Sequence, residues 1–485
     1  MFFTLLLLGI SMLADSLAFM DESQYGASEV VDPVLIHSAH TRHERSAMHM
    51  PDVLHFRFEL SGTEVSLNLT QSERDIESYP VYVTDGRGTV LQTDLPLHEN
   101  TAVYRSSAQG SAAIITRKTE DIYQLTGTIH LNNQTYKISP KKHHVDKRQA
   151  STSRNQHELR EIVSFNMDND TAFPSIKEAL PSNDQGIPSN TQGMSNGQAE
   201  YIIELAVFPD FSDYAGFFQE AEDNTTVTIS NMRLHYAFVG EMMQVRYDTV
   251  NEQDPSISIT VWIKYINIAT SAAGSPWTET TKNTNVVPAV QALMNHARYL
   301  FVNAPRSADA YMIFTRYALS NPDPVIGVAA FDYLCTDLPV SITVNFPDGI
   351  VGITAAHELG HILGLRHDSD IGCNNTDLYV MTSALNFPSP LTPSNPWTFS
   401  PCSVATLKTS LSAPEKACAL NTSISDSTLS TNGRRAGQMT DGDQQCAARF
   451  RYDFIFSREE KLLILIRNKH CLEANATASN VSAFD

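Results

Sequence analysis

The 485-residue chain contains no cysteine before Cys335, relatively few basic residues and no long apolar run. Lysine and arginine number 34 against 54 aspartates and glutamates, which gives a formal net charge of −20. This balance argues against nucleic acid or an anionic membrane surface as the partner, because both are bound through basic patches. No stretch reaches the roughly 18 consecutive apolar residues that a membrane-spanning helix needs. Hydrophobic residues still make up 42% of the chain, which is enough for a sizeable core.

Residues 1–18 form a short apolar segment that ends in Ser16-Leu17-Ala18, although neither Lys nor Arg follows Met1 directly. Small residues at the two positions that signal peptidase reads predict a cleaved signal peptide. Eight Asn-x-Ser/Thr sequons agree with this prediction, at Asn68, Asn133, Asn169, Asn224, Asn374, Asn421, Asn475 and Asn480. We therefore expect a secreted, extracellular glycoprotein with no membrane span.

Residues 19–148 contain short stretches in which apolar and polar residues alternate, for example residues 55–60 and 64–69. Alternation with a period of two, interrupted by turn residues, predicts a β-rich module. The segment closes with the basic pair Lys147-Arg148, where a processing protease could cut. Residues 149–198 are rich in Ser, Asn, Gln, Gly and Pro, and this composition predicts a flexible linker.

Residues 199–424 alternate between predicted strands and predicted helices, which indicates an α/β unit with a mostly parallel sheet. The predicted strands are Tyr201–Phe208, Ser256–Ile268, Asp309–Arg316 and Ile326–Tyr333, and the predicted helices are Asn231–Val250 and Val286–Val302. Residues 425–485 are expected to form a short tail that contains two cysteines.

The segment from Gly349 to Met381 carries the chemistry. His357 and His361 stand four residues apart, so that on a helix both imidazoles lie on one face and can bind one metal ion. Gly364 can end the helix and bring His367 back as a third ligand. Three histidines leave one position of a tetrahedral zinc ion open to water, and Glu358 can then act as the general base on that zinc-activated water.

The alternative is an amphipathic core helix that carries histidines without a metal. We consider it the weaker interpretation, because Glu358 and two histidines in the middle of an apolar helix would be costly to bury unless a partner satisfied them.

The extended motif resembles that of the metzincin peptidases, whose three histidines are followed by a methionine turn. Met381 in Tyr379-Val380-Met381 fits that turn. In metzincins the residue directly after the third histidine distinguishes the families. Here that residue is Asp368, and with it the chain resembles the adamalysin (reprolysin) family of snake-venom metalloproteases, ADAMs and ADAMTS proteases. The resemblance implies an α+β fold of the metzincin type, with a mixed, mostly parallel five-stranded sheet and a zinc helix behind a β-rich propeptide. It also implies that an extended peptide substrate pairs with the edge strand of the sheet.

The resemblance further implies disulfide bridges and a second metal site. By this resemblance, Cys335–Cys418 is the long bridge and Cys373–Cys402 the shorter one, and we also expect a third bridge, Cys446–Cys471. A structural calcium site would use four residues, namely Glu204, Asp309, Cys418 and Asn421.

Two functions from different classes remain. The first is a secreted zinc endopeptidase that acts on extracellular proteins. The second is a secreted, toxin-like binding protein in which the peptidase domain is only a scaffold. Retention of Glu358 favours the first, since a scaffold needs no general base. Because residues 19–148 have no cysteine, any latency that they impose cannot use a thiolate on the metal.

Overall fold

The computed structural model describes residues 25–39, 50–96, 98, 100–131, 134–141, 155–162, 198–304, 307–336, 338–346, 350–374, 377–383 and 395–420. The predicted signal peptide and the predicted C-terminal tail with Cys446 and Cys471 lie outside these residues. None of the helices in the described part is both long and apolar enough to cross a membrane.

The N-terminal part of the described chain forms an antiparallel nine-stranded sheet, which we call the pro-sheet. Its alternating strands bury one face: in β3 (Val53–Leu60), Leu54, Phe56 and Phe58 are each at most 4% exposed. The strands, in spatial order, are β1 (Tyr25–Val31), β11 (His157–Ile162), β10 (Gln134–Pro140), β9 (Tyr123–Leu131), β8 (Ser111–Arg117), β7 (Thr101–Ser106), β4 (Thr63–Gln71), β3 and β2 (Val34–Ala39).

Strand β11 corrects one expectation. Residues 157–162 were predicted to lie in a flexible linker, but they pair with β1 and with β10 inside the pro-sheet. Three of the six residues, His157, Leu159 and Ile162, are at most 1% exposed. This short alternating strand was not predicted because the segment around it is rich in Ser, Asn, Gln, Gly and Pro.

The second sheet is mixed and has seven strands rather than the five expected. The additional strands are β5 and β6, which come from the N-terminal segment; β5 pairs in parallel with β13. In spatial order the strands are β18 (Gly327–Ala329), β19 (Val340–Val344), β15 (Ala310–Thr315), β12 (Ala199–Pro209), β13 (Ile257–Ala269), β5 (Val81–Thr84) and β6 (Thr89–Gln92). Only the pairs β18·β19 and β5·β6 are antiparallel.

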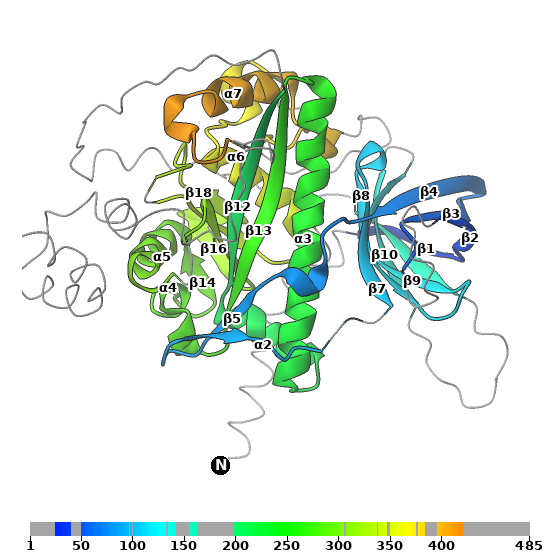
Figure 1. Cartoon of the computed structure of the whole chain (residues 1–485), viewed down its shortest axis with the longest axis horizontal. Coiled ribbons are helices and arrows are strands. Elements are labelled where there is room, and N and C mark those ends of the chain that lie inside the picture. Colours follow the sequence, from blue (N-terminus) through cyan, green and yellow to red (C-terminus); the bar gives the residue numbers. More distant parts are fainter. Residues whose placement is uncertain are drawn as a thin grey trace, which may run out of the picture. The chain divides into compact units, whose positions relative to one another are not determined.

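Helices cover both faces of this sheet (Figure 1). Alternate residues of β12 belong to different cores: Leu205 packs in the cluster that includes α3 and α6, and Phe208 packs in the cluster that includes α5. The helices are α2 (Phe211–Glu220), α3 (Thr225–Gln253), α4 (Pro276–Glu279), α5 (Ala289–Asn303), α6 (Val351–Ile362) and α7 (Pro401–Leu411). A small sheet of β14 (Val286–Pro288), β16 (Ala318–Asn321) and β17 (Asp323–Val325) precedes and follows α5 in the chain.

The long predicted elements of this unit agree with the observed ones, but several boundaries and short elements differ. Helix α3, for example, begins at Thr225 rather than at the predicted Asn231. The predicted helix at Val286–Val302 begins only at Ala289, because its first residues form β14. The predicted strand at Ile326–Tyr333 shrinks to the three residues of β18. Helix α2 and strand β19 were not predicted.

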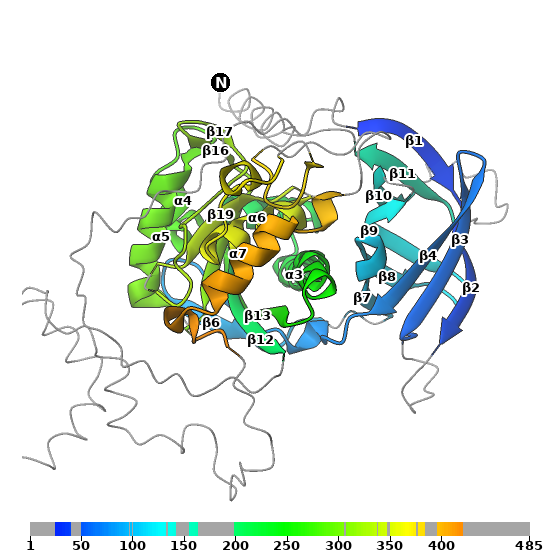
Figure 2. The same cartoon turned by 90° about the horizontal axis from the view of Figure 1, so that it is seen from above.

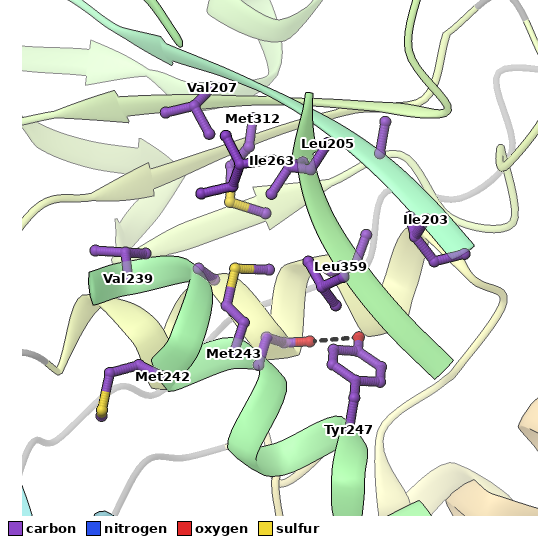
Figure 3. Packing of buried hydrophobic residues seen from close by; sticks show 14 of the residues in the cluster. Ile203, Leu205, Val207, Val239, Met242, Met243, Tyr247, Ile263, Met312 and Leu359 are labelled. Atoms are coloured by element: carbon purple, nitrogen blue, oxygen red, sulfur yellow. Dashed lines mark hydrogen bonds between the residues drawn. The ribbon is translucent and has the colours of Figure 1, made fainter. Parts of the chain in front are cut away.

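Helix α3 packs directly on α6. The Tyr247 hydroxyl donates to the Ala356 carbonyl at 3.0 Å, and Leu359 of α6 lies near Met243 of α3 (Figure 3). A Cβ on Gly352 would stand 2.3 Å from the Met242 Cβ, so glycine is required for this close approach. The two helices thus form one buried layer under the sheet.

Candidate metal centre

Helix α6 and the turn after it bring three histidines together. All twelve residues of α6 are buried. The ring centroids of His357 and His361, one helical turn apart, are separated by 4.7 Å, and the His367 ring is 5.4 Å and 5.0 Å from them. One ligand nitrogen from each ring lies within 4.8 Å of the others, which is a spacing that could hold one metal ion.

Gly364 makes the turn that returns His367 to this position. Its φ of +95° lies in the left-handed region that side chains rarely adopt. A Cβ there would also meet the Ser410 Oγ at 2.7 Å and the Asp332 Oδ1 at 2.8 Å. The Gly364 amide donates to the His361 carbonyl at 3.0 Å, which closes the end of the helix.

Backbone carbonyls set the tautomers of two of the rings. His357 Nδ1 lies 2.6 Å from the Val380 oxygen, and His361 Nδ1 lies 2.7 Å from the Leu365 oxygen. Because a carbonyl only accepts, each Nδ1 carries the proton and each Nε2 keeps its lone pair. Neutral imidazoles oriented in this way fit the requirements of zinc, for which such carbonyl contacts fix ligand direction.

Glu358 follows His357 and is fully buried. Its carboxylate lies against the backbone of β18, because a Cβ on Gly327 would stand 2.1 Å from the Glu358 Oε1. Gly327 was not among the site residues predicted from the sequence. A glycine inside a short predicted strand was the available signal, since it often marks a close backbone approach.

Met381 lies beneath the helix that carries the histidines. A Cβ on Gly360 would come within 2.6 Å of the Met381 Sδ, so the glycine between the motif histidines gives the methionine its space. The Met381 carbonyl accepts from the Asp368 amide at 2.9 Å. Met381 therefore contacts both the helix that carries two of the histidines and the residue that follows the third.

Asp368 joins the metal-site turn to α7. Its Oδ1 accepts from the Ser400 hydroxyl at 2.5 Å and from the Ser403 hydroxyl at 2.9 Å. Ser400 is also the N-cap of α7, because its Oγ accepts from the Ser403 amide at 3.0 Å. The residue that served as a family marker in the sequence thus has a structural role next to His367.

Two disulfides brace the same region, Cys335–Cys418 and Cys373–Cys402, and these are the pairs that the resemblance implied. The first closes a separation of 83 residues and the second a separation of 29. The third expected pair, Cys446–Cys471, lies outside the described residues.

The four residues of the expected calcium site are placed only in part. Asp309 and Glu204 are adjacent, since the Asp309 amide donates to the Glu204 carbonyl at 2.8 Å and the Glu204 amide donates to Asp309 Oδ2 at 2.9 Å. Burial raises the pKa of the Asp309 carboxyl above its usual value. The Lys264 ammonium forms an ion pair with the Glu204 carboxylate. Cys418 is disulfide-bonded, and Asn421 lies outside the described residues.

Comparison with known proteins agrees with a zinc site formed by these three histidines. Residues 266–423 match the Reprolysin (M12B) family zinc metalloprotease. The chain is 29% identical over 181 residues to the human protein "A disintegrin and metalloproteinase with thrombospondin motifs 1", across 36% of this chain and 16% of that protein. It is 28% identical over 130 residues to the Mus musculus protein "A disintegrin and metalloproteinase with thrombospondin motifs 20", across 26% of this chain and 6% of the relative. The match thus spans only a small part of the length of either relative.

Proposed function

Because the chain contains a metalloprotease domain of the reprolysin and ADAM type, we propose that it is a secreted zinc-dependent endopeptidase that cleaves extracellular proteins. One observation carries the proposal: three buried histidines could hold one metal ion, and the buried Glu358 follows the first of them on the same helix. The disulfides and the predicted signal peptide support an extracellular location.

The histidines and Glu358 have different roles in peptide hydrolysis. His357, His361 and His367 would hold a zinc ion, which would supply Lewis-acid polarisation of a carbonyl and of a water molecule. Glu358 accepts the proton of the attacking water at a carboxylate oxygen and returns it to the leaving amine. Full burial of Glu358 limits competing solvation, and the carbonyl contacts of His357 and His361 hold the rings in one orientation.

The position of strand β18 suits it to bind an extended peptide substrate. It stands at the edge of the seven-stranded sheet and pairs with β19 on one side. An extended peptide that adds to such an edge is held by its backbone, so that varied sequences can bind. Since Gly327 of β18 lies against Glu358, a peptide paired there would pass close to the proposed general base.

The test is an assay on casein or gelatin, with and without a chelator, using protein freed of residues 19–148. Chelator-sensitive cleavage supports the endopeptidase. Specific binding of an extracellular protein without cleavage, by a preparation loaded with zinc, would instead favour the toxin-like binding protein built on a peptidase scaffold.

We also propose that residues 19–148 act as a propeptide without a thiol. The segment has no cysteine, so latency would come from a different group at the metal or from cover over the cleft. A variant with Lys147 and Arg148 both changed to Ala should stay uncut and less active than a chain starting at Gln149. Equal peptidase rates would contradict the inhibitory role.

A calcium site at Glu204, Asp309, Cys418 and Asn421 remains our proposal. Oxygen ligands of this kind suit calcium, and a bound ion would raise the melting temperature by mass action. We expect calcium to raise the melting temperature of the zinc-loaded protein. The increase should be larger in Lys264→Ala, because that change frees the Glu204 carboxylate from its ion pair. An unchanged melting temperature in both proteins would rule the site out.

A further inference from the structure

Strand β11 belongs to the part of the chain that follows the basic pair Lys147-Arg148, yet it is an internal strand of the pro-sheet. On one side its residues 157–161 pair with residues 136–140 of β10. On the other side it pairs with β1, where five residue pairs run from Tyr25↔Ile162 to Val31↔His157. A cut after Arg148 would therefore divide the chain into two fragments, and both fragments would contribute strands to the same sheet.

The side chains of β11 are built into the pro-sheet as firmly as its backbone. His157 is fully buried, and its Nε2 accepts from the Leu125 amide at 2.9 Å, while its Nδ1 donates to the Asn155 carbonyl at 3.0 Å. Leu159 is 1% exposed and belongs to the core of the pro-sheet. The Ser28 hydroxyl donates to Glu158 at 2.7 Å. The partners Leu125 and Ser28 lie before the basic pair.

A second contact joins the N-terminal segment to residues 199–424, which we call the catalytic unit. Arg105 of β7 forms ion pairs with Glu241 at 3.4 Å and with Asp248 at 3.0 Å, both on α3. The Ser72 hydroxyl donates to the same Glu241 carboxylate at 2.7 Å. Figure 2 looks along α3, with β7 and β8 beside it; both strands contact this helix.

Strand β5 of the N-terminal segment adds a third contact. Residues 81–84 of β5 pair in parallel with residues 266–269 of β13, and the Ile266 amide donates to the Pro80 carbonyl at 2.9 Å. Val81 is 1% exposed and belongs to the core that contains α3 and α6. The N-terminal segment thus supplies β5 and β6 to the seven-stranded sheet, and the pro-sheet contains β11 from the part of the chain after the basic pair.

We propose that cleavage after Arg148 does not release the pro-segment: residues 19–148 stay bound as a non-covalent partner, with β11 of the catalytic chain as the strand that retains them. Release then requires a second cut after Ile162. This inference rests on the proposed division of the chain into pro-segment and catalytic unit, but not on catalysis.

The physical reason is strand complementation. Withdrawal of residues 19–148 would strip β11 of its backbone partners on both sides and leave β1 and β10 with an open gap between them. It would also expose Leu159 and the other side chains that the strand buries. A cut after Ile162 costs none of these contacts, because β11 then leaves together with the pro-sheet.

The experiment compares two cut positions in the full-length protein. In one variant a recognition sequence for a site-specific protease replaces residues 145–150, and in the other the same sequence replaces residues 176–181. Each protein is cut to completion, diluted in steps and analysed by size-exclusion chromatography and sedimentation. We expect the fragments cut before β11 to remain together to a dilution at least about tenfold greater, which corresponds to the burial of one side chain such as Leu159.

Equal dissociation of the two cut proteins would overturn the proposal. A matched pair of substitutions in β11 sharpens the result. Leu159→Asp in the protein cut before β11 should release the fragment, whereas Arg160→Asp, at a side chain that is 40% exposed, should not. The readout is fragment association, so a failure here is distinct from a failure of the proposed peptidase activity.

Discussion

Helices α6 and α3 are both buried over most of their length and both carry buried polar residues, but the partners of those residues differ in origin. On α6, His357 and His361 lie close to His367, which follows within ten residues of His357. On α3, Glu241 is 2% exposed and meets Ser72 and Arg105, which lie well over 100 residues earlier in the chain.

The comparison shows that burial of a polar group does not reveal its role, whereas its partners do. The polar residues of α6 converge on a point where a metal ion fits, and this points to chemistry. On α3, Glu241 is matched by Ser72 and Arg105 of the N-terminal segment, and this points to docking. Substitutions in the two helices should therefore separate activity from assembly.

The largest expected effect is on α6. Glu358→Ala should reduce peptide cleavage about a thousandfold, because general acid–base catalysis commonly contributes factors of about 10² to 10⁴. Zinc content and fold should be retained, since Glu358 is not one of the three candidate ligands. Metal analysis and peptide cleavage are measured on the same sample. His361→Ala is the contrasting variant and should lower zinc content. Substantial turnover by Glu358→Ala at full zinc occupancy would remove Glu358 from its role.

A smaller loss of activity is expected at β18. Gly327→Ala places a Cβ where the Glu358 carboxylate lies, 2.1 Å from Oε1 in the present arrangement. Displacement of a catalytic group by about 1 Å can cost roughly 10²-fold in rate. We expect kcat/KM to fall by about ten- to a hundredfold while zinc content stays the same. An unchanged kcat/KM would mean that β18 does not confine the carboxylate.

On α3 we expect an effect on stability. Arg105→Ala leaves the buried Glu241 without this ion pair and should lower the free energy of unfolding of the uncut protein by about 1–3 kcal/mol. Arg57→Ala is the matched control, because its pair with Glu64 has the same 3.4 Å separation but side chains that are 43% and 67% exposed. That control should cost less than about 1 kcal/mol. Urea unfolding measures both, and equal losses would contradict a special role for the α3 contact.

The smallest expected effect is a pH dependence where the pro-sheet touches the catalytic unit. The Trp397 indole N–H donates to His130 Nδ1 at 2.8 Å. Burial, with a smaller effect of Arg246, lowers the pKa of His130 to about 4. The folded state therefore disfavours the charged form. Its contribution to stability is complete above the unfolded pKa of about 6.5 and declines as the pH falls towards 4.

Acidification from pH 7 to pH 5 should therefore cost about 1.5–2 kcal/mol through this one residue. His130→Gln should remove that part of the pH dependence. The check is the difference between the unfolding free energies of the two proteins at several pH values. A difference that does not change with pH would show that His130 does not contribute.

The sequence by itself determined the features that depend on neighbours in the chain. The spacing of His357 and His361 follows from 3.6 residues per helical turn, and Gly364 permits the turn to His367 because it lacks a Cβ. Alternation predicted the strands of the N-terminal segment, and long apolar periodic runs predicted α3, β12 and β13. The family resemblance supplied the two disulfide pairs that the structure contains.

Only the tertiary structure decided which distant segments meet. Local patterns do not set the partner of a strand, since any strand offers the same backbone donors and acceptors and the choice depends on packing across the whole fold. For this reason the pairing of β5 with β13, and of β11 with strands of the pro-sheet, could not be predicted from their own residues. The approach of Gly327 to Glu358, and the ion pair of Arg105 with Glu241, could not be predicted for the same reason: each joins residues far apart in the chain, and no periodic pattern in the sequence relates them.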